Sequence, residues 1–209
     1  DAMRNEARAW RRAIPTGRLL ALLALGALAA CQPLTRPPPP AGSWAERKAQ
    51  LQSASRWRFD GRVAVSGVES GGSAGIRWQQ ADARSRVSVF GTLGAGGINI
   101  LLDAGHLHVK TSRGEEVDGE EAARVIDDRL GAPLPLAELR YWLLGVTAPG
   151  SESTEVLGEN QRLAALTQKG WEVHFAEYQR VAGDLLPARV DARRAQVRVK
   201  LRISRWQWQ

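Results

Sequence analysis

Three histidines, His106, His108 and His174, are the side chains best suited to binding a metal or transferring a proton. His106 and His108 alternate with apolar residues in HLHVK (106–110), so they would share one face of a strand. A metal needs further ligands, and the sequence has neither a cysteine partner nor an HExxH pattern to supply them. We therefore interpret the histidines as solvent-facing and expect no metal site, no cofactor and no catalytic residue.

The stretch FGTLGAGGINILLD (90–103) suggests different chemistry, because glycine-rich turns often hold phosphate. Its glycines are Gly91, Gly94, Gly96 and Gly97. A dinucleotide fingerprint starting at Gly94 would need a third glycine where Asn99 stands, and a strand pattern follows instead of a helix. A hairpin whose turn needs positive φ explains the glycines better, and it leaves Leu93 at the tip with little to bury it.

The first thirty residues have the pattern of a secretory signal peptide. Met3 is a candidate start, which would place residues 1–2 upstream of it. Five arginines lie ahead of an apolar stretch, LLALLALGALAA (19–30), that is too short to span a bilayer. We expect residues 1–30 to direct export.

Cys31 is the only cysteine of the chain, and it follows the apolar stretch in Leu28-Ala29-Ala30-Cys31. This tetrapeptide resembles the bacterial lipobox, whose cysteine begins the mature protein and receives acyl chains. The alternative is an unmodified cysteine after an ordinary signal peptide. In the enteric sorting rule that the resemblance brings in, an aspartate at the next position favours the inner membrane. Gln32 stands there, so we expect anchoring in the outer membrane, with the domain facing the periplasm.

A proline-rich segment, PLTRPPPP (33–40), comes next, and it favours extended polyproline II structure that cannot pack a core. We interpret residues 31–42 as a lipidated cysteine with its tether and residues 43–209 as the globular domain. A domain of this size buries roughly 70% of its unfolded surface, which suffices for folding without disulfides. The net charge is +7, of which +3 falls in residues 1–31, so the domain itself is only mildly basic.

Alternation of apolar and polar residues dominates the domain and predicts strands with one buried face. The expected strands are 58–66, 75–79, 86–90, 97–102, 106–110, 155–168, 171–180, 186–194 and 196–207. In the last strand the apolar side chains face one way and the basic side chains the other: Val197, Val199, Leu201 and Ile203 against Arg198, Lys200 and Arg202.

Three helices are expected between and before these strands. Ser43 and Glu46 form a capping-box pattern for a helix that ends near Ser53. A second helix is predicted over 119–129, and a third begins in PLPLAELRYWLLG (133–145) with an apolar stripe on one face. The predicted fold is mainly β (α+β): one antiparallel sheet of nine to eleven strands that curls into a barrel or half-barrel, with two or three helices.

Several separated motifs, taken in order, are similar to the LolB family of outer-membrane lipoprotein receptors over about residues 44–208. They are IRWQQ (76–80), the Thr92-Leu93-Gly94 turn, PLPL (133–136), LRYWLLG (139–145) and the basic last strand that ends in Trp206. The chain departs from the family pattern at Thr92, where a proline is frequent, so the turn is looser.

The resemblance implies an incomplete barrel with helices over its mouth and an apolar cavity inside. It implies a non-enzymatic protein that accepts lipoproteins from the periplasmic carrier LolA and inserts them into the outer membrane. Its partners would be LolA, acylated lipoproteins as cargo and outer-membrane phospholipid, with no nucleic acid, and we expect a monomer. An exposed leucine on a strand-connecting loop, which helps membrane insertion in the family, maps onto Leu93.

Eight apolar residues are the expected lining of the cavity: Ile76, Trp78, Val87, Val89, Ile98, Ile100, Trp142 and Leu143. The same pattern fits a filled core, which would make the chain a structural or assembly lipoprotein with a protein partner. The basic last strand with Trp206 and Trp208 fits a nucleic-acid binder, but the export signal argues against that class.

Overall fold

Helix α2 (Trp44–Ser53) opens the part of the chain that the computed structural model describes, which is residues 42–67, 71–91, 96–130 and 133–208. Its start has the predicted capping box, because Ser43 Oγ accepts from the Glu46 amide and the Glu46 carboxylate accepts from the Ser43 amide. Leu51 is its one buried residue, so α2 packs on the surface of the domain.

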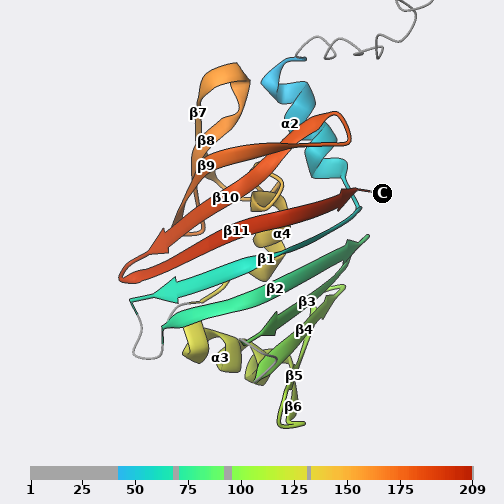
Figure 1. Ribbon diagram of the computed structural model, residues 1–209, viewed down its shortest axis with the longest axis vertical. Helices are drawn as coiled ribbons and strands as arrows, with labels where there is room; N and C mark the ends of the chain where they lie inside the picture. The colour runs from blue at the N-terminus through green and yellow to red at the C-terminus, as the bar shows by residue number, and fades with distance from the viewer. Residues whose placement is uncertain (1–41, 68–70, 92–95, 131–132, 209) are drawn as a thin grey trace, which may run out of the picture. The chain divides into compact units, whose positions relative to one another are not determined.

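Eleven strands of the described residues form a single antiparallel sheet, in the spatial order β6-β5-β4-β3-β2-β1-β11-β10-β9-β8-β7 (Figure 1). Their bounds are β1 Arg56–Ser66, β2 Gly72–Ala81, β3 Arg84–Phe90, β4 Gly97–Asp103, β5 His106–Thr111, β6 Glu116–Asp118, β7 Ser153–Leu157, β8 Leu163–Gln168, β9 Trp171–Val181, β10 Asp184–Arg194 and β11 Val197–Trp208. The sheet is not closed, because β6 and β7 are its two edges. The predicted fold class is confirmed.

The sheet differs from the sequence prediction at two places. The segment 155–168, predicted as one strand, is two strands, β7 and β8, separated by a 3₁₀ turn at Glu159–Gln161. Gln161 has a positive φ of 51°, which interrupts the extended backbone there. The edge strand β6 was not predicted, because three residues with one apolar side chain are too short to show alternation.

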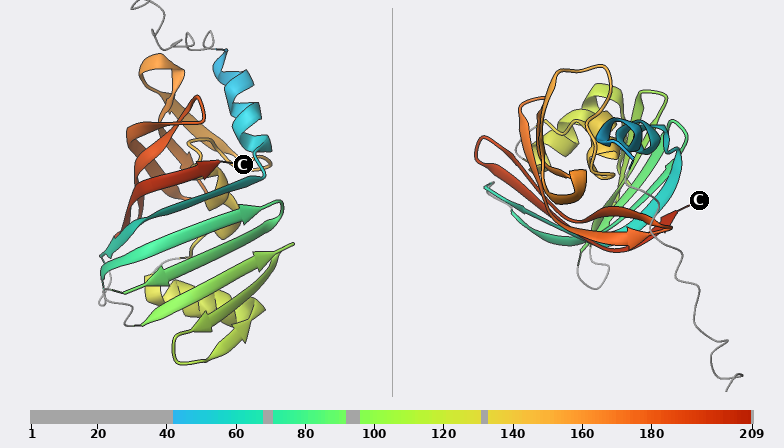
Figure 2. Two further views of the ribbon diagram at one scale, coloured as in Figure 1. Left: turned by 45° about the vertical axis from the view of Figure 1, so that its right-hand side comes forward. Right: turned by 90° about the horizontal axis from the view of Figure 1, so that it is seen from above.

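Helices α3 (Gly119–Leu130) and α4 (Leu136–Trp142) lie on the concave side of the curved sheet (Figure 2). Gly145 follows α4 with a φ of +76°, as expected for the position just past a helix end. None of the described helices is long and apolar enough to cross a membrane.

The first and last strands of the domain meet at the centre of the sheet. β1 is the sixth of the eleven strands in spatial order, and it pairs with β11 along most of its length, with Val63 opposite Leu201. Pro39–Gln209 forms one compact unit and contains all of the described core, so this segment can be studied as an independent domain.

Candidate functional site

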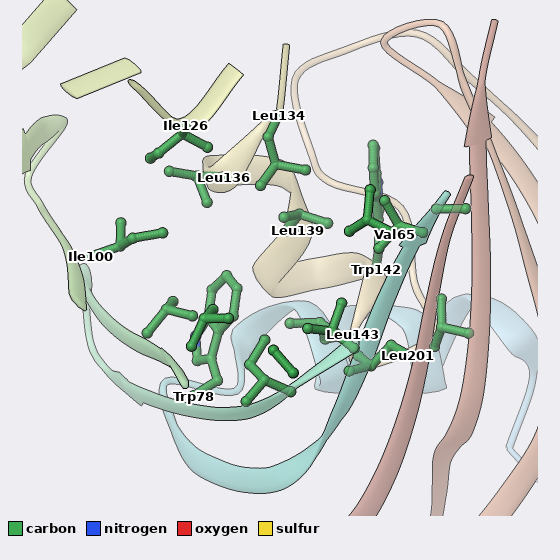
Figure 3. Close-up of a pocket in the computed structure, with 18 of the residues that line it drawn as sticks. Val65, Trp78, Ile100, Ile126, Leu134, Leu136, Leu139, Trp142, Leu143 and Leu201 are labelled. Atoms are coloured by element: carbon green, nitrogen blue, oxygen red, sulfur yellow. The ribbon is translucent and has the colours of Figure 1, made fainter. Parts of the chain in front are cut away.

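A cavity of about 380 Å³ lies between the concave face of the sheet and the helices α3 and α4 (Figure 3). Its sheet side is lined by Phe59, Val63, Val65, Gly72, Ser73, Ala74, Ile76, Trp78, Val87, Val89, Ile98, Ile100, Trp171, Val173, Val190, Ala192, Val199 and Leu201. Its helix side is lined by Ile126, Leu134, Leu136, Leu139, Trp142 and Leu143. Protein interiors are closely packed and seldom leave a void larger than a water molecule, so a hollow of this size is a specific feature of the fold.

The lining is almost free of polar atoms. Ser73 contributes the one hydroxyl, and no ionisable side chain lines the cavity in the described part of the chain. The indole N–H groups of the three lining tryptophans all have protein partners: Trp78 donates to Gln80 Oε1 at 3.2 Å, Trp142 to Gln168 Oε1 at 2.8 Å, and Trp171 to the Pro133 carbonyl at 3.2 Å. With these donors occupied, the cavity selects for an apolar molecule.

Four aromatic side chains pack together beside the cavity. Trp57 and Phe59 contact each other, and each contacts Trp78 and Trp206, with ring centroids 5.3–6.5 Å apart in stacked and edge-on pairs. Trp206 is held in place by a 3.0 Å hydrogen bond from its Nε1 to the Pro187 carbonyl. Phe59 and Trp78 also line the cavity, so this packed cluster forms one of its walls.

Residues 133–143, which we call the lid, cover the cavity from the helix side (Figure 3). The end of the lid is fixed to the sheet by Gln168 at the end of β8. Besides accepting from Trp142, Gln168 accepts from the Ala148 amide at 2.9 Å and donates to the Ala148 carbonyl at 2.9 Å and to Ser151 Oγ at 2.8 Å. Gln168 is 1% exposed, so these bonds are made away from water.

Glu155 on β7 fixes the segment that follows the lid to helix α2. Its carboxylate accepts from Thr147 Oγ1 at 2.7 Å, from Trp44 Nε1 at 2.9 Å and from Lys48 Nζ at 2.5 Å. Partial burial acts to raise the pKa of Glu155, but the three hydrogen bonds and the Lys48 charge outweigh it and hold the pKa below its usual value.

A second hollow, an open groove of about 730 Å³, lies on the other side of the lid. Leu134 and Leu136 line both the groove and the cavity, so these two side chains separate them. The groove is also lined by Arg140 and Tyr141 and by the turns that follow β2 and β4.

Comparison with known proteins places this cavity in a family. The family model described as "Outer membrane lipoprotein LolB" matches residues 55–206, which contain every cavity-lining residue. The chain belongs to the LolB family. The outer-membrane lipoprotein LolB of Nitrosococcus oceani is 30% identical over 193 residues, which cover 89% of this chain and 94% of the relative.

Solved structures agree on the fold. A LolA superfamily protein from Nitrosomonas europaea has a TM-score of 0.53 at 10% identity, covering 80% of this chain and 94% of that protein. A DUF1329 family protein from Desulfovibrio piger has a TM-score of 0.56 at 7% identity, covering 79% and 90%. LolB-family membership makes the chain an outer-membrane lipoprotein with a role in lipoprotein localisation. The proteins of this family are localisation factors rather than enzymes.

The structure brings all eight predicted cavity residues of this LolB-family domain together in one lining. Six come from the sheet (Ile76, Trp78, Val87, Val89, Ile98 and Ile100), and two come from the lid (Trp142 and Leu143). Cross-strand pairing aligns them, because Trp78 lies opposite Val87 and Val87 opposite Ile100.

The other two-thirds of the lining residues were not predicted from the sequence. Val63, Val65, Val173, Val190, Ala192, Val199 and Leu201 belong to strands at the start and end of the domain. Their alternation is as clear as that of the predicted residues, but only the pairing of β1 with β11 brings the two groups onto one concave face. On the lid, Leu136 and Leu139 belong to the predicted apolar stripe, and that stripe was the sequence pattern that could have identified them as lining residues.

The glycine-rich turn is partly described. β3 and β4 pair as the predicted hairpin, with Phe90 opposite Gly97, and the Gly91 amide donates to the Gly96 carbonyl at 3.2 Å. Gly96 has the expected positive φ, at 71°. Leu93, Thr92 and Gly94 lie outside the described residues, as do Cys31, the signal peptide and the proline-rich tether.

The histidines lie on the sheet and away from the cavity. His106 and His174 are exposed, and His108 Nδ1 lies 2.7 Å from Asp118 Oδ1 on the neighbouring edge strand β6. The partner of His108 in the structure is therefore a carboxylate.

Proposed function

We propose that this domain takes the acyl chains of lipoproteins from the periplasmic carrier LolA into its cavity and passes them to the outer membrane without covalent chemistry. One observation carries the proposal: the cavity is hollow, apolar and without a free hydrogen-bond donor from its three tryptophans. Such a site suits a saturated hydrocarbon chain and offers only the Ser73 hydroxyl to a polar group.

The energy at stake explains why such a cavity is needed. At about 0.8 kcal/mol per buried CH₂, three acyl chains with roughly 45 carbons would cost on the order of 35 kcal/mol to expose to water. A protein that passes them between carrier and membrane must therefore shield them throughout. Transfer then requires that the cavity hold the chains better than the carrier does and less well than the bilayer.

The lid gives the site a way to enlarge. A volume of about 380 Å³ is at the lower end for a ligand pocket, which suits part of a three-chain cargo. Movement of Leu134 and Leu136 would join the cavity to the groove of about 730 Å³ on the other side of the lid. Cargo binding therefore displaces the start of the lid, while Gln168 keeps its end in place.

Two residues outside the described part complete the proposal. Lipid attached to Cys31 anchors the domain in the outer membrane, and Leu93 inserts into the bilayer when cargo is released. β3 ends at Phe90, three residues before Leu93, and Phe90 is 40% exposed.

The alternative of a structural lipoprotein with a filled core is disfavoured by the cavity itself. The test uses residues Pro39–Gln209 and a fluorescent fatty-acid probe, with binding followed by the change in probe emission. We expect saturable binding in the micromolar range, since partial burial of one chain provides several kcal/mol. If the folded domain does not bind the probe, the carrier function is wrong and the structural role replaces it.

A further inference from the structure

The convex face of the sheet is strongly basic along its central strands. Arg62 of β1, Arg202 of β11 and Arg189 of β10 are direct cross-strand neighbours, and all three are exposed. Neighbouring strands lie about 4.8 Å apart, so three like charges stand in register across them, which destabilises a sheet. Glu177 of β9 offsets part of this repulsion, because its carboxylate lies 3.0 Å from Arg189 and 3.9 Å from Arg202. Arg62 has no such carboxylate among the described residues, so the row still favours a partner of opposite charge.

The row is part of a larger set, which we call the basic face. It comprises nine of the outward-facing cations of β1, β2, β10 and β11: Arg58, Arg62, Arg77, Arg189, Arg193, Arg198, Lys200, Arg202 and Arg205. Arg56, at the start of β1, lies beside this set and pairs with Asp82. Four carboxylates lie among or beside the nine cations. Asp60 pairs with Arg77, Asp191 with Arg198 and Arg193, and Glu177 of β9 with both Arg189 and Arg202. Glu172 of β9 lies opposite Arg193. The remaining charge is strongly positive, although the domain as a whole is only mildly basic.

The cations without a carboxylate gather on the two central strands. In the described part of the chain, no carboxylate oxygen lies within 4.0 Å of Arg58, Arg62, Lys200 or Arg205. β1 is the sixth of eleven strands, so β1 and β11 form the crest of the curved sheet, on the side away from α3 and α4 (Figure 2). These four side chains therefore lie near the middle of the convex face.

The composition of the basic face favours a lipid surface over a protein. Protein interfaces centre on buried apolar or aromatic side chains. Among the described residues, the large hydrophobic side chains that are exposed are Phe90, Val156 and Leu157, and none of them lies on β1, β2, β10 or β11. Eight of the nine cations are arginines, whose planar guanidinium groups bind phosphate oxygens in pairs. Phospholipid headgroups provide such phosphates at a flat surface.

We propose that the basic face docks the domain onto a membrane surface that contains anionic phospholipid. The proposal goes beyond acyl-chain transfer, because it assigns a partner to the side of the sheet opposite the cavity. A domain docked in this way lies with β1 and β11 against the headgroups and with the lid facing the aqueous side. Incoming cargo can then reach the lid while the domain remains at the membrane.

The experiment measures binding of residues Pro39–Gln209, which lack the lipid anchor, to two kinds of vesicle. One contains roughly one-third phosphatidylglycerol in phosphatidylcholine, and the other contains phosphatidylcholine alone. We expect co-sedimentation with the anionic vesicles at low salt and its loss at about 0.5 M salt, where charges are screened within roughly 4 Å. Equal binding to both vesicles, or no binding to the anionic ones, overturns the proposal; the second result would leave an acidic protein as the partner.

Paired charge reversals locate the surface. Arg58→Glu with Arg62→Glu places carboxylates opposite Gln79, Gln207 and Arg202, so folding should not suffer. We expect affinity for anionic vesicles to fall at least about tenfold. Arg113→Glu with Arg124→Glu is the control, because it makes the same change of charge on exposed residues off the basic face.

If both double variants lose affinity equally, net charge alone drives binding and the basic face has no special role. Binding of the fatty-acid probe is measured in parallel for each protein. Loss of vesicle binding with intact probe binding supports docking by the basic face. Failure of probe binding in the unaltered domain refutes the carrier function and leaves the vesicle result standing.

Discussion

Trp142 Nε1 donates a 2.8 Å hydrogen bond to Gln168 Oε1, and this bond fixes the lid of the cavity to its sheet. Trp142 is the last residue of α4 and Gln168 the last of β8, and each is 1% exposed. Because Trp142 also lines the cavity, the position of one amide side chain on the sheet determines the shape of the hollow beneath the lid.

Replacing Gln168 should therefore weaken both the fold and the site. Gln168→Met leaves the indole of Trp142 and the amide of Ala148 without acceptors, and we expect a loss of about 3 kcal/mol in the free energy of unfolding. Affinity for a fatty-acid probe should fall as well, because Trp142 is no longer fixed. Urea denaturation and probe titration measure the two effects. Gln196→Met, at an exposed turn, is the control, and equal stability of the two variants would contradict the role of Gln168.

Filling the cavity should block acyl-chain binding at little cost to stability. Ala74 on β2 lines the cavity, and Ala74→Phe places a ring in space that the chain would occupy. If the ring displaces about three methylenes, affinity for the probe should fall by about 2 kcal/mol, or roughly thirtyfold. Ala176→Phe makes the same substitution at an exposed position on β9 and should bind normally. Unchanged binding by Ala74→Phe would place the acyl chain elsewhere.

Acid should loosen the attachment between α2 and the segment after the lid. The pKa of Glu155 lies below its usual value of 4.5 in the folded domain, so its carboxylate stabilises the fold above that pH. This contribution is lost as the pH falls through the lowered pKa. We expect Glu155→Gln to be less stable than the unaltered domain at neutral pH, with the difference shrinking as the pH falls below 4.5 and through the lowered pKa. Melting temperatures across this range test it, with Glu172→Gln as the exposed control. A difference independent of pH would rule out the charge as its cause.

Leu93 should matter for release and not for binding. Leu93→Glu puts a charge into the segment of sequence between β3 and β4, and a carboxylate enters a bilayer with difficulty. We expect this variant to fold and to bind the acyl probe normally but to fail in transferring lipoprotein to liposomes. Leu93→Met keeps an apolar side chain and should transfer normally. Normal delivery by folded Leu93→Glu would exclude the hairpin tip from membrane insertion.

Local patterns in the sequence predicted much of the fold. Alternation predicted most of the strands, the Ser43–Glu46 pattern predicted the start of α2, and Gly145 marked the end of α4. These features depend on interactions between residues within a few positions of each other, so a short stretch of sequence is enough to predict them. The same is true of six cavity residues on β2, β3 and β4, which are consecutive hairpins.

Only the tertiary structure decided whether the curled sheet is filled or hollow. Trp57, Phe59, Trp78 and Trp206 pack together because β11 pairs with β1, a contact between the two ends of the domain. Mostly aliphatic residues, with Trp142 and Trp171, line the rest of the cavity and leave a void, although the pattern of alternation along the strands is the same. Periodicity determines which side chains face inward, but the curvature of the sheet and the seating of the lid determine whether they touch. The same long-range pairing aligns Arg62, Arg202 and Arg189 on the outside, which no single strand could show.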